Sequence, residues 1–488
     1  MSNGLQARYE RLHTERQPYL TRARAAAKLT IPSLMPDEGA NESTSFVTPW
    51  QSLGSRGTNN LASKILLAMF PPNSAFFRFK LDEGEQEQLD DATKGDVDKA
   101  LATYERILTA DIENSKFRSA MYQAGRHLIV CGNALLFDDP DNGMRMYPLN
   151  RYVVKRDAAG KVWEIIALDT TMWKSLKPEV QAAIGTVHKE DDDVNLYTGI
   201  KLSGNKWEIH QEIDDITLPG SESTYNEDAS PWIPLRPVAL DGESYGRGFV
   251  EELYGDLNTL DVLTQAITEG AGIAALVKFL VDPNGSTDKD DLINTENGGF
   301  ATGRDSDVTV LRVDKGGDLS VALNASEKIE TRLAFAFLLN SAAQRDAERV
   351  TAEEIRFLAQ ELEDALGGIY SVLSQELQQP LVKWRTKKLT AAGKLPPLPK
   401  QVNTEIITGL EALGRGHEHQ RLRAFVGDST NTFGPEITAE YVEVSEYLKR
   451  SAAALNVPTE GLVREEDQVQ QNRQARAEAE AAASQPQQ

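Results

Sequence analysis

The 488-residue sequence lacks several features that define whole classes of protein. It has one cysteine, Cys131, which excludes an internal disulfide and a multi-cysteine zinc site, and which we expect to be a small buried residue. Its longest apolar runs, such as HLIVCGNALLF and AALVKFLV, are too short to span a bilayer. The polar start, MSNGLQARYERLHTERQPYL, has no apolar core like that of a secretory signal. We therefore expect a protein that folds in the cytosol and does not use a membrane.

Basic residues are also scarce. The sequence has 52 Lys and Arg against 74 Asp and Glu, which gives a formal net charge of -22 and a pI near 4.8. Tight binding of duplex nucleic acid normally requires a basic face, because phosphate neutralisation supplies much of the affinity. An acidic wall repels phosphates instead, so this composition is compatible with a conduit through which DNA slides.

Motifs of catalysis are weak or absent. GLEALGRG, 409–416, has the glycine spacing of a phosphate-binding loop, but Arg415 and Gly416 stand where Lys and Ser or Thr are required. His417 and His419 have no third and fourth ligand nearby in sequence. HKEDDD, 188–193, could present carboxylates to a divalent ion, although an acidic loop beside a strand is the favoured interpretation. We expect no cofactor, no metal and no enzyme activity.

The first half of the chain predicts a mixed α+β structure. Helical patterns cover 1–30, 48–72 and about 94–130. YVVKRDAAGKVWEIIALD alternates β-branched and aromatic residues around a turn at Asp157–Gly160, which predicts a hairpin, and strand character continues to about 213.

The second half is mainly helical. Apolar residues recur at helical spacing from Phe249 to Val281, and Pro283 and Gly285 then predict a turn. The insert to about 318 carries the strand-like GGFATG and DVTVLRV. A second helix is expected from Asn324, which has Glu327 three residues later as in a capping box.

The stretch AAQRDAERVTAEEIRF, 342–357, places two arginines just before a long helix. Thr351 and Glu354 form a second capping-box pattern, so Arg345 and Arg349 should lie in or beside a loop. On spacing alone, pairing with neighbouring acidic residues is favoured. A leucine-rich stripe then continues to about 389, and the helix should bend at 367–368 and at Pro380.

Several long segments, in order, resemble the portal proteins, or head-tail connectors, of short-tailed podoviruses of the autographivirus type. The segments are YERLHTERQPYLTRARAAAKLTIPSLMP, TPWQSLGSRGTNNLASKILLAMFP, YVVKRDAAG, LRPVALDGESYGRGFVEELYGDL, ERVTAEEIRFLAQELEDALGGIYSVLSQELQQPLV and TGLEALGRG. The resemblance covers nearly the whole chain and departs from the family only in the short low-complexity tail.

The resemblance implies an α+β, mainly helical portal fold that assembles as a ring of twelve. Its parts are a wing, 1–248; a first stem helix, 249–282; a clip, 283–318; a second stem helix, 319–340; a tunnel loop, 341–352; a long wing helix, 353–395; a crown, 396–460; and a polar tail, 461–488.

The resemblance also implies a function at one capsid vertex of the virion, after synthesis in the cytoplasm of a bacterial host. The ring would be a channel for genome packaging and ejection. The implied partners are double-stranded DNA, the terminase large subunit, tail adaptor and tail proteins, major capsid and scaffolding proteins, and internal core proteins at the crown.

The predicted site residues fall into two sets. Lys278 and the tunnel-loop residues Arg345 and Arg349 would face DNA, since a ring multiplies each residue into a circle of copies. The residues expected to dock partners at the clip are Asp288, Lys289, Asp290 and Asp291. Two alternatives stay open at this point: a metal-dependent DNA-processing enzyme built around HKEDDD, and a capsid or tail adaptor subunit without a channel.

Overall fold

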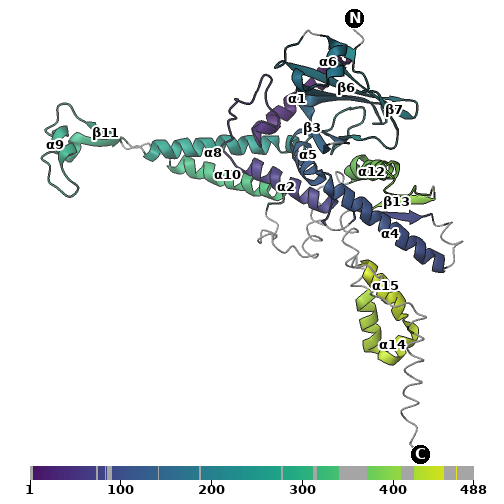
Figure 1. Cartoon of the computed structure of the whole chain (residues 1–488). Helices are drawn as coiled ribbons and strands as arrows, with labels where there is room; N and C mark the ends of the chain where they lie inside the picture. Colours follow the sequence, from purple (N-terminus) through teal and green to yellow (C-terminus); the bar gives the residue numbers. More distant parts are fainter. Residues whose placement is uncertain are drawn as a thin grey trace, which may run out of the picture. The chain divides into compact units, whose positions relative to one another are not determined.

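The computed structural model describes residues 4–72, 75–82, 84, 91–140, 142–185, 188–275, 278–311, 316–339, 371–399, 401–407, 422–454 and 469. The described chain mixes helices and antiparallel sheets, as the sequence predicts (Figure 1). It divides into two compact units. Unit 1 comprises Met1–Leu66, Ala110–Ala342 and Gly368–Pro396, and unit 2 comprises Leu67–Thr109, Ala343–Gly367 and Pro397–Gln488.

Unit 1 is built on a six-stranded antiparallel sheet. The strand order is β4-β5-β6-β7-β8, and β9 also pairs with β7. The strands are β4 (Tyr152–Arg156), β5 (Val162–Met172), β6 (Asp193–Ser203), β7 (Lys206–Ile213), β8 (Ile216–Thr217) and β9 (Ser223–Asn226). The predicted β4–β5 hairpin is confirmed, and its turn closes with a hydrogen bond of 3.0 Å from the Gly160 N–H to the Asp157 carbonyl. Gly160 has a φ of +84°, a conformation that favours glycine.

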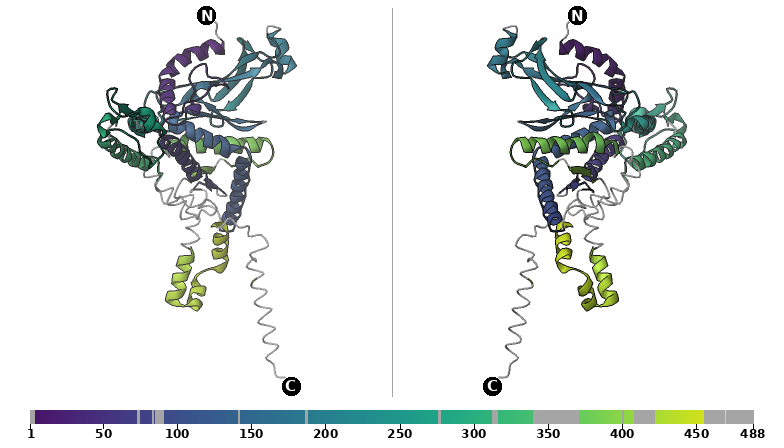
Figure 2. Two further views of the ribbon diagram at one scale, coloured as in Figure 1. Left: turned by 90° about the vertical axis from the view of Figure 1, so that its left-hand side faces the viewer. Right: turned by 90° about the vertical axis from the view of Figure 1, so that its right-hand side faces the viewer.

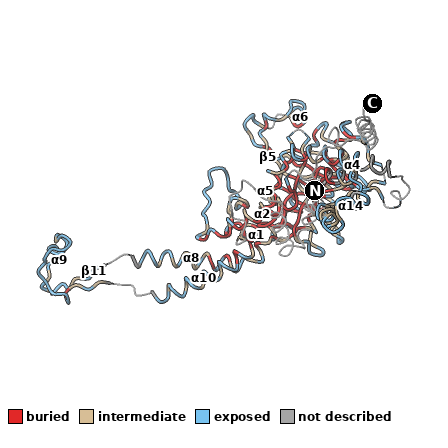
Figure 3. The backbone as a smooth tube through the Cα atoms, turned by 90° about the horizontal axis from the view of Figure 1, so that it is seen from below, coloured by how far each residue is buried: buried red, intermediate tan, exposed pale blue. Residues whose placement is uncertain are grey.

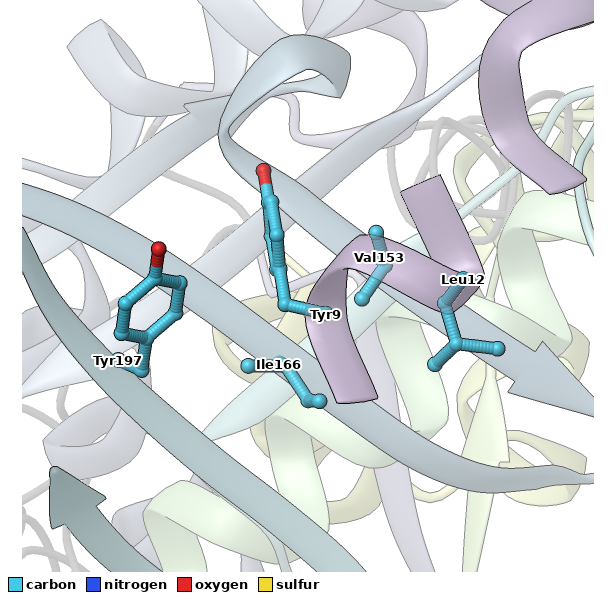
Figure 4. Packing of buried hydrophobic residues seen from close by; sticks show 5 residues of the cluster. All are labelled: Tyr9, Leu12, Val153, Ile166 and Tyr197. Atoms are coloured by element: carbon cyan, nitrogen blue, oxygen red, sulfur yellow. The ribbon is translucent and has the colours of Figure 1, made fainter. Parts of the chain in front are cut away.

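Helix α1 (Leu5–Lys28) packs along one face of this sheet (Figure 2). Tyr9 and Leu12 of α1 meet Val153, Ile166 and Tyr197 of three neighbouring strands in a buried cluster (Figure 4). The helix therefore supplies the apolar cover that an antiparallel sheet needs on one face.

A second sheet in unit 1 has three strands in the order β10-β2-β3. They are β10 (Trp232–Leu235), β2 (Ala134–Asp139) and β3 (Gly143–Pro148), and they lie next to helix α5 (Phe117–Cys131). The single helix predicted over 94–130 is wrong in one respect. It is divided at Lys116, whose φ of 60° is left-handed, into α4 (Asp91–Asn114) and α5. Cys131 is buried, as expected.

Two long helices of unit 1 form an antiparallel pair, α8 (Tyr254–Ala275) and α10 (Gly316–Ala336), which lie side by side in Figures 1 and 3. Between them the chain forms a two-stranded hairpin, β11 (Lys278–Val281) and β12 (Val308–Leu311), with the short helix α9 (Lys289–Asn294) in its loop. The short α7 (Phe249–Glu252) directly precedes α8 in the sequence, and helix α2 (Leu53–Met69) lies near the base of the pair in Figure 1.

The predicted limits of this pair need three corrections. The first helix ends at Ala275 and not at Val281, because VKFLV pairs as a strand with VTVL. The second helix begins at Gly316, so Asn324 and Glu327 lie inside it and do not cap it. GGFATG forms no strand, whereas the strand predicted in DVTVLRV is confirmed as β12.

The described end of the helix predicted over 353–395 contains a π-helical turn. Residues 371–373 are α-helical, Ser374–Gln378 form the π-turn, and α12 (Gln379–Ala391) follows. The bend expected at Pro380 stays a prediction, and the structure adds a π-turn directly before that proline. The other expected bend, at 367–368, and the Thr351–Glu354 cap lie outside the described residues.

Unit 2 pairs two strands that are far apart in the sequence, β1 (Phe77–Leu81) and β13 (Val402–Ile406). A chain of ring contacts stabilises the region around β1, and it runs through Phe70, Phe76, Phe77, Phe79 and Tyr104. Residues 422–433 are helical, followed by α14 (Pro435–Tyr441) and α15 (Val444–Ala454).

The remaining short elements are η1 (Pro32–Leu34), η2 (Leu149–Arg151), η3 (Trp173–Ser175), α6 (Pro178–Ile184) and η4 (Asp305–Asp307). None of the helices in the described ranges combines the length and the apolar character needed to cross a bilayer.

Candidate functional site

The candidate site is the projecting part of unit 1, in the described residues 254–275, 278–311 and 316–336. From here on we call the α8–α10 pair the stem and the hairpin 278–311 the clip, which includes most of the clip predicted over 283–318. An exposed ion pair joins the stem helices, with Arg332 Nη2 at 2.8 Å from Asp256 Oδ1. Near their other end, a Cβ at Gly270 would lie 2.9 Å from a methyl of Leu319. These two contacts fix an antiparallel pair in close approach.

Burial along the stem is uneven (Figure 3). At the base, Leu257, Leu260 and Leu333 are buried. Farther along, apolar side chains on both helices remain uncovered. They are Val262 (57% exposed), Ile273 (56%), Val321 (70%), Leu323 (48%) and, back toward the base, Phe335 (76%). Several exposed apolar residues on both helices of a pair are typical of a surface that another chain covers.

The stem is acidic. Helix α8 contains Asp256, Asp261 and Glu269 and no Lys or Arg, and α10 contains three acidic residues against two basic ones. Such a surface repels phosphate groups, so it does not provide tight contacts to a nucleic acid backbone.

The clip is organised by one carboxylate, Asp307. Its Oδ2 accepts hydrogen bonds from the backbone N–H groups of Ser286 (2.8 Å) and Thr287 (3.2 Å) and from the Thr287 hydroxyl (3.0 Å). Burial raises the pKa of Asp307, but the bonds from Thr287 and Ser286 outweigh it and hold the pKa below the usual value. Gly285 lies so close that a Cβ there would be 2.7 Å from the Asp307 carboxyl carbon.

The four predicted docking residues lie together on the surface of the clip. Asp288 is the N-cap of α9, and its side chain accepts a bond of 2.9 Å from the Asp290 N–H. Lys289, Asp290 and Asp291 form the first turn of that helix and are exposed. Acidic residues in this turn also complement the helix dipole.

The clip also has an exposed apolar surface, which is not among the sites predicted from the sequence. Phe279, Leu280, Ile293 and Phe300 are all exposed, and Phe300 is exposed completely. The signal was present in the sequence, because GGFATG places a phenylalanine directly after two glycines, where it cannot join a regular apolar stripe.

Lys278 occupies a different element from the one predicted. Lys278 is the first residue of β11, and its backbone pairs with that of Leu311. We expected it near the end of the first stem helix. Aromatic and β-branched residues in KFLV favour a strand once a partner strand is available. Arg345 and Arg349 lie outside the described residues, so their position in a loop stays a prediction.

The acidic loop HKEDDD makes its contacts within the protein. His188 Nε2 lies 2.5 Å from Asp214 Oδ2, and Lys174 Nζ lies 2.6 Å from Asp191 Oδ1. Asp192 Oδ2 accepts a bond of 2.8 Å from the Lys189 N–H. Across the described part of the chain, no group of three or more His, Cys, Asp or Glu residues could hold a metal ion. The candidate phosphate loop and His417 and His419 lie outside it.

Comparison with known proteins gives a consistent result. The family described as "Bacteriophage head to tail connecting protein" matches residues 2–463. The chain is 42% identical to the portal protein of Enterobacteria phage T3 over 484 residues, which cover 96% of this chain and 89% of that protein. It is 42% identical to the portal protein of Escherichia phage T7, covering 96% and 90% of the two chains, and 35% identical to that of Enterobacteria phage SP6, covering 86% and 81%.

Proposed function

Because the chain belongs to the bacteriophage head to tail connecting proteins and groups with the portal proteins of podoviruses, we propose that twelve copies form a ring around a channel for double-stranded DNA. Portal proteins are structural components of the virion and not enzymes, and they form ring assemblies at the head-tail junction. In this proposal the ring serves genome packaging and ejection at one capsid vertex.

The observation that carries the ring is the uncovered apolar surface of the stem. A cyclic ring of more than two copies needs a contact between two different surfaces of the same chain. Val262 and Ile273 on α8, and Val321 and Phe335 on α10, provide apolar residues on both helices. Neighbouring stems would bury them, which supports the assignment of α8 and α10 as stem helices.

Polar substitutions on the stem test the ring. Val321→Ser with Phe335→Ser should raise the protein concentration needed for ring formation at least tenfold. Each apolar side chain that is buried on association contributes about 1.5–3 kcal/mol to it. The single chain should stay folded, since both side chains are exposed in it. Mass photometry and end-on electron micrographs would measure the assembly.

Thr331→Ser is the matched control, because Thr331 is exposed on the same helix and the variant should form rings normally. A stable monomer of the unaltered protein at micromolar concentration would contradict the proposal. Rings with no central opening would favour the channel-free adaptor instead.

We assign the path of DNA to the acidic stem and to three basic residues. The acidic α8 lets phosphates pass without binding, whereas Arg345 and Arg349, repeated twelve times, would form a basic collar that contacts the DNA backbone and not the bases. Lys278 is proposed as a further basic residue on the channel side.

The clip is the proposed docking surface for the terminase large subunit during packaging and for the tail adaptor afterwards. The exposed residues Asp288, Lys289, Asp290 and Asp291 would provide charged contacts, and Ile293 and Phe300 in the same segment provide apolar ones. Hot spots of protein interfaces are often aromatic side chains within a polar rim.

A deletion of 286–300 would test this docking, but it removes the Ser286 and Thr287 groups that bind Asp307. Ile293→Ser with Phe300→Ser is sharper, because both side chains are exposed and the hairpin should still fold. We expect normal rings and at least tenfold less packaged DNA. Asn297→Ser, also exposed, is the control, and normal packaging by the double variant would refute the assignment.

The remaining contacts follow the same architecture. The wing would contact the major capsid and scaffolding proteins, and the crown, which includes α14 and α15, would contact the internal core proteins. The polar tail, 461–488, would extend from the crown.

A further inference from the structure

The π-turn Ser374–Gln378 contains one cluster of buried charge, at Glu376, and precedes a second one, in α12; the contacts of the two clusters differ. The turn carries its own hydrogen bond, from the Gln379 N–H to the Ser374 carbonyl five residues earlier. Pro380 follows and has no N–H to donate to the Glu376 carbonyl four residues before it. An α-helix is therefore interrupted here, and the π-turn includes one residue more than an α-helix would over the same length.

Before Pro380, the Glu376 carboxylate lies between two arginines of the wing. Its Oε1 accepts bonds from Arg236 Nε at 2.9 Å and from Arg156 Nη1 at 3.3 Å. Its Oε2 is buried and accepts no hydrogen bond from the described residues. Both arginines also donate to backbone carbonyls, Arg156 to Gly160 and Pro234 and Arg236 to Glu243, so their positions do not depend on Glu376 alone.

After Pro380, α12 is held by a carboxylate of β2. Asp138 is completely buried and uses both oxygens: Oδ2 accepts from Trp384 Nε1 at 2.6 Å and Oδ1 accepts from Arg385 Nη2 at 2.9 Å. Lys388 Nζ lies 3.4 Å from Asp138, and Arg385 Nη1 donates to Asp111 at 2.8 Å. The signs of the charges are opposite in the two clusters. At Glu376 the helical residue is acidic and its partners are basic, whereas in α12 the helical residues are basic and Asp138 of β2 is acidic.

We propose that Ser374–Gln378 is a register joint, in which the contacts of Glu376 with Arg156 and Arg236 select the π form while the Asp138 cluster keeps α12 in place. Side chains of an α-helix turn by about 100° per residue. If the extra residue were lost from the turn, the helix before it would rotate by about that angle relative to α12. Glu376 would then leave the face that meets the two arginines.

The two carboxylates differ in exposure and in the number of their contacts, and this difference determines which set of contacts breaks first. Glu376 bonds through one oxygen, keeps 19% of its side chain exposed, and faces arginines that have other acceptors. Asp138 has no exposure and four contacts from three side chains. Removing Asp138 would leave the buried Arg385 with one fewer carboxylate partner. This loss costs far more free energy than the loss of the Glu376 contacts. The joint can therefore change register at Glu376 without disturbing α12.

Amide hydrogen exchange on the full-length protein tests the joint. Glu376→Gln keeps the shape of the side chain and removes its charge, so exchange at residues 374–379 should increase about tenfold, as expected for loss of a charge-assisted hydrogen bond. Exchange at residues 384–391 should not change. Lys383→Gln, exposed on the same helix, is the control and should leave both segments as they are. Asp138→Asn should instead increase exchange throughout α12.

Adding Pro380→Ala to Glu376→Gln separates a register joint from ordinary support of the helix. The double variant can donate a hydrogen bond from position 380 and has no charge to hold the π form, so it should form a continuous α-helix and regain protection at 374–379. Such recovery supports the joint. If Glu376→Gln has no effect, if its effect extends equally into 384–391, or if the double variant is as unprotected as the single one, the proposal is overturned.

Discussion

At the scale of single residues, buried charges determine how helices join the sheets of unit 1. Arg16 is almost completely buried in α1 and forms no ion pair with the described carboxylates. Its Nη1 donates to the Leu149 carbonyl at 2.8 Å and to the Tyr152 carbonyl, and its Nη2 lies 3.2 Å from the Tyr9 hydroxyl. A guanidinium can donate to several acceptors at once, so Arg16 supplies hydrogen bonds to the carbonyl groups where η2 meets β4.

The sequence could not distinguish these arginines from surface ones. Arg16, Arg156 and Arg385 are buried, and each donates to a carbonyl or carboxylate more than seventy residues away in the chain. Such contacts leave no local pattern of spacing. Asp288–Asp291 do form a local pattern, a charged cluster directly after a turn, and their role in docking stays a prediction.

His127 should make the protein less stable at acidic pH. Burial, with a smaller contribution from Arg126, lowers its pKa to about 4. The unfolded chain binds the same proton at the ordinary pKa of 6.5, so acidification between these values favours unfolding. The difference corresponds to about 3 kcal/mol. We expect the thermal midpoint of unit 1 to fall from pH 7 to pH 5.

His127→Gln should flatten this part of the pH profile, whatever it does to stability at pH 7. A profile as steep in the His127 variant as in the unaltered protein would assign the acid sensitivity to other groups.

At the scale of elements, local signals were sufficient for hairpins and insufficient for helix ends. The β4–β5 hairpin follows from alternating residues around Asp157–Gly160, and both features act over a few residues. The end of α8 was missed because a short apolar run, VKFLV, fits helix and strand equally well, and only pairing with β12 decides. The sequence predicted only a bend at Pro380 and no π-turn, because a proline predicts an irregularity in a helix without specifying its form.

The stem pair provides a test of close helix packing. Gly270→Val should destabilise the stem by up to about 1 kcal/mol relative to the control below, because the Leu319 methyl that lies 2.9 Å from the position of a Cβ would have to move aside. Gly272→Val is the matched control in the same helix, where nothing lies within 4 Å of the Cβ position. Both variants change helix propensity equally, so the difference between them measures the contact alone.

Amide exchange in α8 and α10 would report this difference. Faster exchange in Gly270→Val than in Gly272→Val, in both helices, is the expected outcome. Equal exchange in the two variants would mean that the helices do not pack at Gly270 in solution.

At the scale of the whole molecule, the pattern of helices and strands predicted an α+β chain but not its assembly into units. β1 and β13 pair although more than three hundred residues separate them, and no periodicity in either segment indicates the other. The family resemblance supplied the division into wing, stem, clip and crown. The structure provides separate support for an assembly, because a single molecule would expose the apolar side chains of the stem to water.

The basic collar is the prediction that depends most on the complete assembly. One chain carries only Arg345 and Arg349 in the predicted loop, but twelve copies would place twenty-four guanidinium groups around the DNA. The acidic stem repels phosphate, so these arginines would be the main attractive contacts, and contacts to the backbone do not depend on base sequence. Arg345→Ala with Arg349→Ala should therefore assemble normally but retain less packaged DNA, by about tenfold or more, on any template.

Nuclease protection of DNA in purified heads would measure this loss, with end-on images to verify the rings. Arg304→Ala is the matched control, because it removes a guanidinium from the clip and should leave retention of DNA unchanged while the rings form. Raising the salt concentration should reduce retention in the unaltered heads toward that of the double variant, since screening weakens phosphate contacts. Full and stable heads from the double variant would mean that Arg345 and Arg349 pair with neighbouring acidic residues and do not hold DNA.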